Sequence, residues 1–444
     1  MRDNDPSDNK PTDASRRALL RGAGMGAAGL AFAGLGLEAA SGRANAAVAN
    51  QTGTAMPAYI GPEPNPYWNS IGPYVIFPQK LPLLRLTDRP VQLETPRHYF
   101  ASAFTPNEAM FVRYHLPGEP NRVDLAKWRL KVEGKVDSPL SLTFADLLND
   151  YEPHDVAAVL QCSGNSRSYF TPRMAGGQWG NGAIANAKWT GVRLRDVLEK
   201  AGVTKGAVQI QFQGLDFGKG PAGYGSHAFM KSWDIDDPAL DEAIIAYAMN
   251  DAPMPMLNGF PTRMVFPGKF ATYWVKHVSW IRLLDHEDTN FWMAKAYKIP
   301  DTPDGATTPE AVKNDEVAMV PIGNVNMPVR SFMATPDGAT KAVAGMPLTA
   351  RGVAFSGTGP VTRVEFSTDG GRNWREATLG TDHGPYSFRE WHADFTPDKP
   401  GQYMLAVRAT DAKGNIQPKD GLWNPGGYLW NKIEQQQLTV GPAA

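Results

Sequence analysis

The chain of 444 residues contains a single cysteine, Cys162. One cysteine cannot form a disulfide within the chain, so the packing of apolar side chains must stabilise the fold. The length is sufficient for two domains with sizeable cores, since a typical domain has about 100 to 200 residues. With 42% hydrophobic and 20% charged residues, the composition is typical of a soluble globular protein.

The charge balance excludes one class of function. The 44 Lys and Arg residues nearly balance the 45 Asp and Glu residues, and no long basic run occurs. We therefore expect no nucleic acid partner, because nucleic acid binding requires a broad basic surface. No segment approaches the roughly 20 uninterrupted apolar residues of a membrane-spanning helix, so we also expect no membrane span.

Residues 1–46 have the features of a twin-arginine signal peptide. Arg16 and Arg17 precede a weakly apolar run rich in Gly and Ala, and Ala44-Asn45-Ala46 offers a cleavage site. A short amphipathic or disordered tail is the alternative. Twin-arginine export carries folded proteins, and the usual reason to fold first is a cofactor inserted in the cytoplasm. The sequence thus predicts a periplasmic protein that carries a cofactor.

Three segments of different composition follow. Residues 47–97 are rich in proline and aromatic residues, and because proline disfavours helices and central strands we expect an extended arm. Residues 98–315 mix strand-like and helix-like segments without the regular alternation of a doubly wound sheet, which predicts an α+β domain. Residues 316–444 show only short strands and turn signals, which is typical of a small β-sandwich.

The surroundings of Cys162 restrict its roles. It follows an apolar run, 156–160, and precedes the polar turn Ser163-Gly164-Asn165-Ser166-Arg167, where backbone N–H groups and a guanidinium could stabilise a thiolate. A buried, inert cysteine is equally compatible with this position. A nucleophile would need a histidine base and a zinc site would need more ligands, and neither spacing is present. A metal that takes its other ligands from an organic cofactor remains.

Several short motifs identify a family. The turn Cys162-Ser163-Gly164-Asn165-Ser166-Arg167 resembles the C-x-G-N-R-R molybdenum loop of the sulfite oxidase family of molybdopterin enzymes. Further motifs resemble that family in the same order along the chain: Phe111 to Pro117, Gly214 to Asp216, Gly259 to Arg263, Val265 to Gly268, Trp274 to Lys276, and Trp292 to Lys298. The C-terminal segment resembles the family's immunoglobulin-like dimerisation domain.

The resemblance implies a cofactor and its ligands. Cys162 is expected to be the one protein ligand of a molybdenum ion that is also held by a single pterin dithiolene. Soft thiolate ligands suit such a redox metal. The positions that match cofactor-binding residues of the family are Phe111, Arg113, His115, Cys162, Asp216, Asn258, Arg263, Trp274, Val275 and Lys276.

The resemblance also implies a substrate site. Arg113, Arg167 and Arg389 match anion-binding arginines, and Trp179 and Tyr297 are expected to complete the catalytic pocket. Guanidinium groups suit an oxyanion of sulfur because they are planar and permanently charged.

Three residues depart from the family pattern: Tyr114 replaces asparagine, Ser166 replaces the first arginine of the pair, and Asn258 replaces histidine. We expect Ser166 to remove positive charge near the mouth of the site. The serine at this position and the arm rich in proline and aromatic residues are both similar to features of the molybdenum subunit of the Sox-system sulfane (sulfite) dehydrogenases. This resemblance favours sulfane sulfur on a carrier protein as substrate, with free sulfite as the alternative.

Electron transfer requires another chain. The sequence has no C-x-x-C-H site for covalent haem, so the resemblance implies a separate c-type cytochrome subunit and a homodimer within a heterotetramer. Two other classes of protein stay open at this point: a cysteine hydrolase that works without metal, and a non-catalytic exported binding module.

Overall fold

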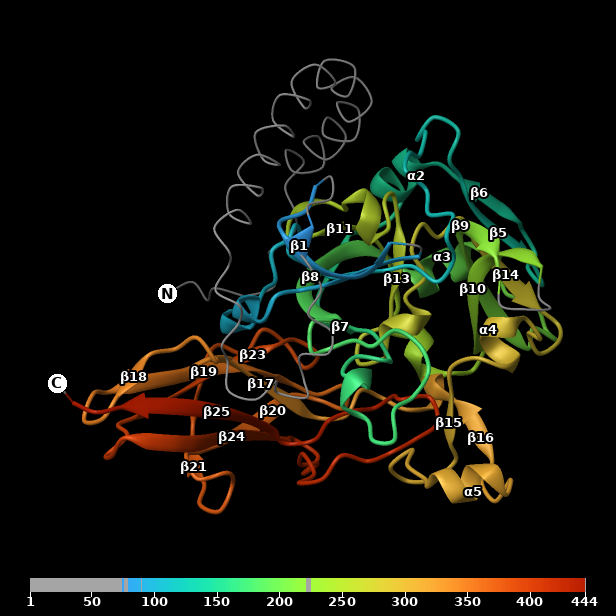
Figure 1. The fold of residues 1–444 in the computed structure, drawn as a ribbon. Helices are drawn as coiled ribbons and strands as arrows, with labels where there is room; N and C mark the ends of the chain where they lie inside the picture. The colour runs from blue at the N-terminus through green and yellow to red at the C-terminus, as the bar shows by residue number, and fades with distance from the viewer. Residues whose placement is uncertain (1–73, 76–78, 89, 221–224, 444) are drawn as a thin grey trace, which may run out of the picture. The chain divides into compact units, whose positions relative to one another are not determined.

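A computed structural model describes residues 74–75, 79–88, 90–220 and 225–443, which all belong to one compact unit, Pro66–Ala444. The predicted signal peptide, 1–46, and most of the predicted arm lie outside the described residues. The first domain is rich in strands, and the strands of the second domain are coloured orange to red in Figure 1.

Two larger sheets form the body of the first domain. One has the order β10-β9-β14-β5-β6, in which only β14 and β5 pair in parallel: β5 (Leu130–Gly134), β6 (Leu140–Leu142), β9 (Gln209–Lys219), β10 (Ser226–Asp234) and β14 (Trp280–Leu284). The other has the order β12-β11-β8-β7, with β13 paired to β11: β7 (His154–Gln161), β8 (Ile184–Arg193), β11 (Ile244–Met249), β12 (Ala252–Pro253) and β13 (Arg263–Val265).

Helices are few and short in the described part of the chain. They are α2 (Phe144–Asn149), α3 (Leu194–Ala201), α4 (Phe291–Ala294) and α5 (Pro309–Lys313), with short 3-10 turns between strands. Thr143 and Asp146 form a capping box at the start of α2, and Gly202 ends α3 with a φ of 69°. The first domain is therefore more strand-rich than an α+β prediction implies.

The end of the predicted arm is a small sheet. Its strands pair in the order β1-β2-β3-β4: β1 (Tyr74–Val75), β2 (Leu83–Asp88), β3 (Val91–Glu94) and β4 (Val112–Arg113). The described part of the predicted extended arm contains β2 and β3 of this sheet. Pro82, Pro90 and Pro96 flank the strands and interrupt none of them, so every residue that pairs can donate its N–H. Leu83, Val91 and Leu93 form a core with Val112 and Tyr114.

The second domain consists of two facing sheets. One is β17-β19-β23-β22 and the other β18-β25-β24-β20-β21, and both contribute to one core that includes Phe366, Trp391 and Leu405. The strands are β17 (Arg330–Thr335), β18 (Ala342–Val343), β19 (Leu348–Phe355), β20 (Val361–Ser367), β21 (Arg375–Glu376), β22 (Thr378–Leu379), β23 (Arg389–Phe395), β24 (Gly401–Asp411) and β25 (Glu434–Gly441). The predicted β-sandwich is confirmed.

One hairpin crosses the predicted domain boundary at 315. Strand β15 (Lys298–Pro300) pairs with β16 (Met319–Pro321), so the first domain extends to about residue 322. No helix in the described residues is long and apolar enough to span a membrane.

Candidate active site

A buried pocket lies where several strands of the first domain end. Its walls come from β4, β9, β10 and β13, from the end of β7, and from two short 3-10 turns, Met256–Asn258 and Ala271–Tyr273. The lining residues are Phe111, Arg113, His115, Leu160, Cys162, Asp216, Phe229, Leu257, Asn258, Arg263, Ala271, Thr272, Trp274 and Lys276.

The structure brings nine of the ten predicted cofactor-binding residues to this pocket. Val275 is the exception, because its side chain is buried beside Gly214 and does not line the cavity. The sequence motifs that contribute the nine residues are far apart along the chain. Their convergence follows from the strand ends that meet at the pocket.

Cys162 begins a tight turn at the end of β7, which we call the cysteine turn (residues 162–167). Its backbone N–H donates to Ala183 O at 2.9 Å, and its carbonyl accepts from Asn165 N at 2.9 Å. The Asn165 side chain closes the same turn by accepting from Ala183 N at 3.0 Å. Cys162 is 7% exposed and faces the pocket, so the thiol is held at a fixed place with access only from the cavity.

Positive charge exceeds negative charge on the pocket wall. Arg113, Arg263 and Lys276 line it together with one acid, Asp216. Arg263 Nη1 donates to Asn258 O at 2.9 Å, and Lys276 Nζ donates to Leu257 O at 3.2 Å. Carbonyl oxygens do not neutralise these cations, so the wall attracts an anionic ligand.

Several buried polar atoms of the wall have no partner among the described residues. They are Arg113 Nε, Asp216 Oδ1 and Arg263 Nε. Buried polar groups in proteins are almost always hydrogen-bonded, so a ligand with both donors and acceptors is required to satisfy this set. A phosphorylated pterin has both kinds of group. The residues present therefore fit the expected cofactor, with the cations suited to its phosphate and Asp216 suited to its ring N–H groups.

Burial changes the protonation of the pocket residues. It raises the pKa of Asp216 to about 7, and it lowers the pKa of Lys276 well below its ordinary value. It also lowers the pKa of Arg263 to about 9. Burial and the charges of Arg113, Lys276 and Lys231 lower the pKa of His115 as well. His115 is therefore neutral, and the wall lacks the counter-charge that would restore ordinary pKa values.

Lys80 supports the pocket from behind and was missed in the sequence. Lys80 is 7% exposed, and its Nζ donates to Asn107 O at 2.8 Å, to Met110 O at 3.1 Å and to Asn258 Oδ1. Asn258 Nδ2 then donates to Phe111 O at 3.3 Å. The polar partner of Asn258, where the family motif has histidine, is therefore a lysine that lies 178 positions earlier in the chain.

Tyr297 marks a second group of predicted residues. Its hydroxyl is hydrogen-bonded to His115 Nε2 and lies 3.4 Å from Arg113 Nη2. Arg113, Tyr428, Cys162 and Arg167 all act electrostatically on this hydroxyl, and burial raises its pKa above the ordinary range. Tyr297 therefore stays protonated as a potential hydrogen-bond donor.

Tyr428 completes this group and comes from the second domain. Its ring stacks on Tyr297 at 5.7 Å between centroids, and the Arg167 guanidinium lies over it at 5.1 Å. Arg167 Nε donates to Gly426 O at 3.1 Å, and Nη1 donates to Gly177 O at 3.1 Å. No motif in the sequence marks Tyr428 as part of the site.

Two predicted catalytic residues are not brought to this group. Arg389 donates to Gly380 O at 3.3 Å and to Val361 O at 3.0 Å, and it lies 3.7 Å from Asp382, all within the second domain. These contacts stabilise the sandwich and do not place the guanidinium at the pocket. Trp179 is 1% exposed and packs edge-on against Phe111 at 6.4 Å, so it supports the wall from behind.

Ser166 corrects a further expectation. It is fully buried, and its hydroxyl accepts from Arg330 Nη2 at 2.7 Å and donates to Asn181 Oδ1 at 2.7 Å. The serine therefore does not lie at the mouth of the site. Positive charge is not lost either, because the Arg330 guanidinium of the second domain reaches the serine.

Asp216→Asn should stabilise the cofactor-free protein at pH 8 by about 1 kcal/mol, because it removes a buried charge whose Oδ1 has no hydrogen-bond partner among the described residues. The folded-state pKa of Asp216, about 7, lies above its ordinary 3.8, so its stabilising contribution is lost as the pH rises from about 4 to about 7. The difference between variant and wild type should shrink toward pH 4. Urea unfolding at the two pH values measures it.

Asp288→Asn is the matched control. Burial alone would raise the pKa of Asp288, but hydrogen bonds from Gln211, Ser232 and Asn290 lower it. The same substitution at this satisfied carboxylate should destabilise the protein by about 1 kcal/mol at pH 8. Equal effects at both positions would contradict the unpartnered state of Asp216.

Comparisons with known proteins agree with this site. The description "oxidoreductase molybdopterin binding domain" matches residues 115–292, and "Mo-co oxidoreductase dimerisation domain" matches residues 323–438. Sulfite oxidase of Gallus gallus is 33% identical over 377 residues, which cover 80% of this chain and 78% of the relative. Mitochondrial sulfite oxidase of Homo sapiens is 34% identical over 388 residues, which cover 83% of this chain and 68% of the relative.

A solved structure shares the fold. The sulfane dehydrogenase SoxCD from Paracoccus pantotrophus matches with a TM-score of 0.67 and 24% identity, over 88% of this chain and 95% of the matched chain. A buried cationic pocket at a single cysteine, the two matched domains and the identity to curated relatives lead to one conclusion. The chain belongs to the sulfite oxidase family of molybdopterin oxidoreductases.

Proposed function

We propose that this protein oxidises sulfane sulfur bound to a carrier protein during thiosulfate oxidation and passes the electrons to a c-type cytochrome subunit. When bound, the molybdenum cofactor supplies an oxygen atom to sulfur and accepts two electrons. Cys162 would hold the metal, and Arg113, Asp216, Arg263 and Lys276 would hold the pterin.

The hydrogen-bond partners of the arginines near Tyr297 favour sulfane sulfur over free sulfite as the substrate. Only two of the three predicted guanidinium groups lie there, because Arg389 is bonded within the second domain. Arg167 uses two of its nitrogens on carbonyl oxygens, and Arg113 Nη1 donates to Tyr114 O. A free sulfite dianion requires several charged donors to offset its desolvation. The terminal sulfur of a persulfide carries less charge and requires fewer.

The aromatic rings beside these arginines fit the same substrate. Tyr297 and Tyr428 stack with an interplanar angle of 20°, and Arg167 covers one face of the pair. Apolar ring faces suit a polarisable sulfur on a protein-borne thiol. The protonated Tyr297 hydroxyl, fixed by His115 and Arg113, would orient the oxygen that develops on the substrate.

Free sulfite is the second candidate. The curated relatives that are 33% and 34% identical to this chain are sulfite oxidases, which favours sulfite as the substrate class of the shared pocket. Arg113 and Arg167 would then bind the anion together.

The surroundings of the enzyme belong to the same proposal. Export through the twin-arginine route would place it in the periplasm, folded and loaded with cofactor. The second domain, which matches a dimerisation domain, would form a homodimer within a heterotetramer that includes the cytochrome. The immunoglobulin-like topology of that domain stays a prediction. Membership of the family replaces the hydrolase and binding-module alternatives.

A substrate comparison tests the proposal. Steady-state reduction of cytochrome c is measured with free sulfite and with a persulfide-bearing carrier protein at equal concentration. We expect kcat/KM to be at least about tenfold higher for the carrier, because the persulfide sulfur carries less charge into the pocket than the sulfite dianion does. Activity with free sulfite and none with the carrier would instead make sulfite the substrate.

The assignment of the arginines has its own test. Arg113→Gln should lower kcat/KM for either sulfur substrate by about tenfold or more, since it removes a charged donor at Tyr297. Arg389→Gln makes the same change at an arginine bonded inside the second domain and should leave kcat/KM unchanged. A fall in kcat/KM for Arg389→Gln as large as that for Arg113→Gln would return Arg389 to the substrate site.

A further inference from the structure

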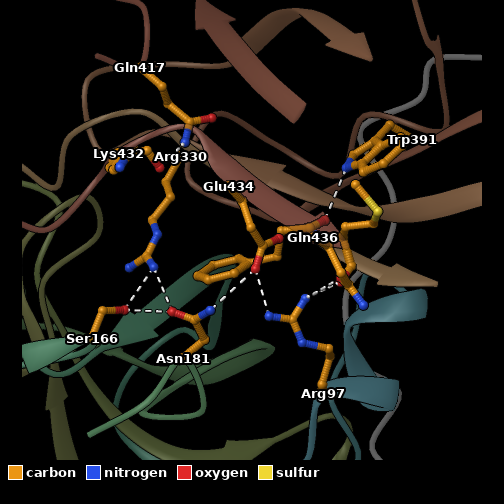
Figure 2. Close-up of polar contacts among 11 residues, drawn as sticks. Arg97, Ser166, Asn181, Arg330, Trp391, Gln417, Lys432, Glu434 and Gln436 are labelled. Carbon is orange, nitrogen blue, oxygen red and sulfur yellow. Dashed lines mark hydrogen bonds and ion pairs between the residues drawn. The ribbon is translucent and has the colours of Figure 1, made fainter. Parts of the chain in front are cut away.

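A chain of hydrogen bonds connects the cysteine turn with the second domain (Figure 2). We call it the interdomain network and define it as Arg97, Ser166, Asn181, Arg330 and Glu434. Arg330 Nη2 donates to Ser166 Oγ at 2.7 Å and to Asn181 Oδ1 at 2.8 Å. Asn181 Nδ2 donates to Glu434 Oε1 at 3.2 Å, and Arg97 Nη2 donates to the same oxygen at 2.6 Å.

Two members of the network, Arg330 and Glu434, belong to strands of the second domain. Glu434 begins β25, and its Oε2 accepts from the backbone N–H of Met333 in β17. Arg330 begins β17, is 4% exposed, and its guanidinium lies over the Phe332 ring at 4.3 Å. Trp391 Nε1 donates to Phe332 O at 3.2 Å, which fixes the strand that carries this ring. The arginine therefore reaches the first domain from a rigid base.

The other side of the network is the cysteine turn itself. Ser166 N donates to Gly180 O at 2.7 Å, while Cys162 N donates to Ala183 O at 2.9 Å. The segment 180–183 thus borders the turn at both of its ends. Arg330 bonds to one side chain on each segment, Ser166 in the turn and Asn181 opposite it. One guanidinium therefore joins the two segments that hold the thiol.

The turn needs this support because its backbone conformation is unfavourable. Ser166 has a φ of 70° and a ψ of 19°, in the left-handed region that residues other than glycine rarely adopt. Surrounding contacts must stabilise such a residue. The hydroxyl of Ser166 has two partners within 2.7 Å, which hold the residue in this conformation. Arg167 is the next residue, so the backbone conformation of Ser166 determines where the Arg167 side chain begins.

We propose that Arg330 is a positioning residue for the active site: through Ser166 and Asn181 it fixes the cysteine turn, and with it Cys162 and Arg167. The second domain would then contribute to catalysis as well as to any subunit contact. This inference rests on the proposed roles of Cys162 and Arg167. It does not depend on which sulfur compound is the substrate.

The single cysteine provides a direct measurement. In the cofactor-free full-length protein, the rate of Cys162 alkylation by iodoacetamide, followed by intact mass, reports how accessible the thiol is, which increases when the turn loses its contacts. Arg330→Gln should raise this rate by about tenfold, as the loss of hydrogen bonds from a charged group predicts. An unchanged rate would overturn the proposal.

Arg408→Gln is the matched control. Arg408 also lies in the second domain, donates to Glu365 at 2.8 Å and stacks over Trp374 at 4.3 Å, so the substitution removes the same kind of interaction elsewhere. It should leave the alkylation rate within twofold of wild type. A tenfold rise in this control would show that general destabilisation opens the turn, which would also overturn the proposal.

Ser166→Gly tests the network from the other side and guards against a variant that fails to fold. Glycine adopts the φ of 70° without strain, so the variant loses the hydroxyl and keeps the backbone. It should also raise the alkylation rate, and the double variant with Arg330→Gln should add little to either single variant, because both remove one shared hydrogen bond. Fully additive effects would contradict the coupling of the two residues.

Turnover of the loaded enzyme provides the functional readout. At matched molybdenum content, Arg330→Gln should lower kcat by about tenfold with any substrate that the wild type accepts, while Arg408→Gln leaves kcat unchanged. A wild type that oxidises neither sulfite nor a persulfide would refute the proposed function but not the positioning role, which the alkylation rates decide. Unchanged kcat in Arg330→Gln would refute the positioning role alone.

Discussion

The excess of buried positive charge around one pocket is the constraint on which the site depends. Arg113, Arg263 and Lys276 face Asp216 across a cavity, and three polar atoms of this set have no partner among the described residues. Burial moves the pKa values of Asp216, Arg263 and Lys276 toward their neutral forms. Such a wall is costly without a ligand, and an anionic cofactor with ring donors offsets the cost. The pocket is thus built for binding rather than for stability.

The fold explains how residues from distant motifs reach this pocket. Strands of two sheets and the turns that follow them line the pocket. Asp216 and Phe229 lie within β9 and β10, and Cys162 follows the end of β7. Strands β1 to β4 form an additional small sheet, whose core includes Val112 next to the pocket residues Phe111 and Arg113. The second domain closes the site with Tyr428 and holds the cysteine turn through Arg330. The active site therefore belongs to both domains.

The sequence predicted the residues that lie in short motifs and missed those that reach the site through long-range contacts. Cys162, Asp216 and Arg263 could be assigned because their neighbours match a family pattern. Lys80 and Tyr428 could not, because no local pattern shows which buried lysine meets Asn258 or which tyrosine stacks on Tyr297. Arg389 shows the opposite error: a motif match placed it at the site, while carbonyl oxygens of the sandwich bind its guanidinium. Ser166 was assigned to the mouth because sequence does not report burial.

The central claim is that Cys162 is the one protein ligand of molybdenum in this pocket. X-ray absorption at the molybdenum edge of the loaded protein tests it directly, since it counts sulfur neighbours of the metal. Relative to wild type, Cys162→Ser should lose one sulfur neighbour while the pterin stays bound and the fold is retained. The same sulfur count in both proteins would contradict the account. A wild-type protein that contains no molybdenum when purified from cells that make the cofactor would also contradict it.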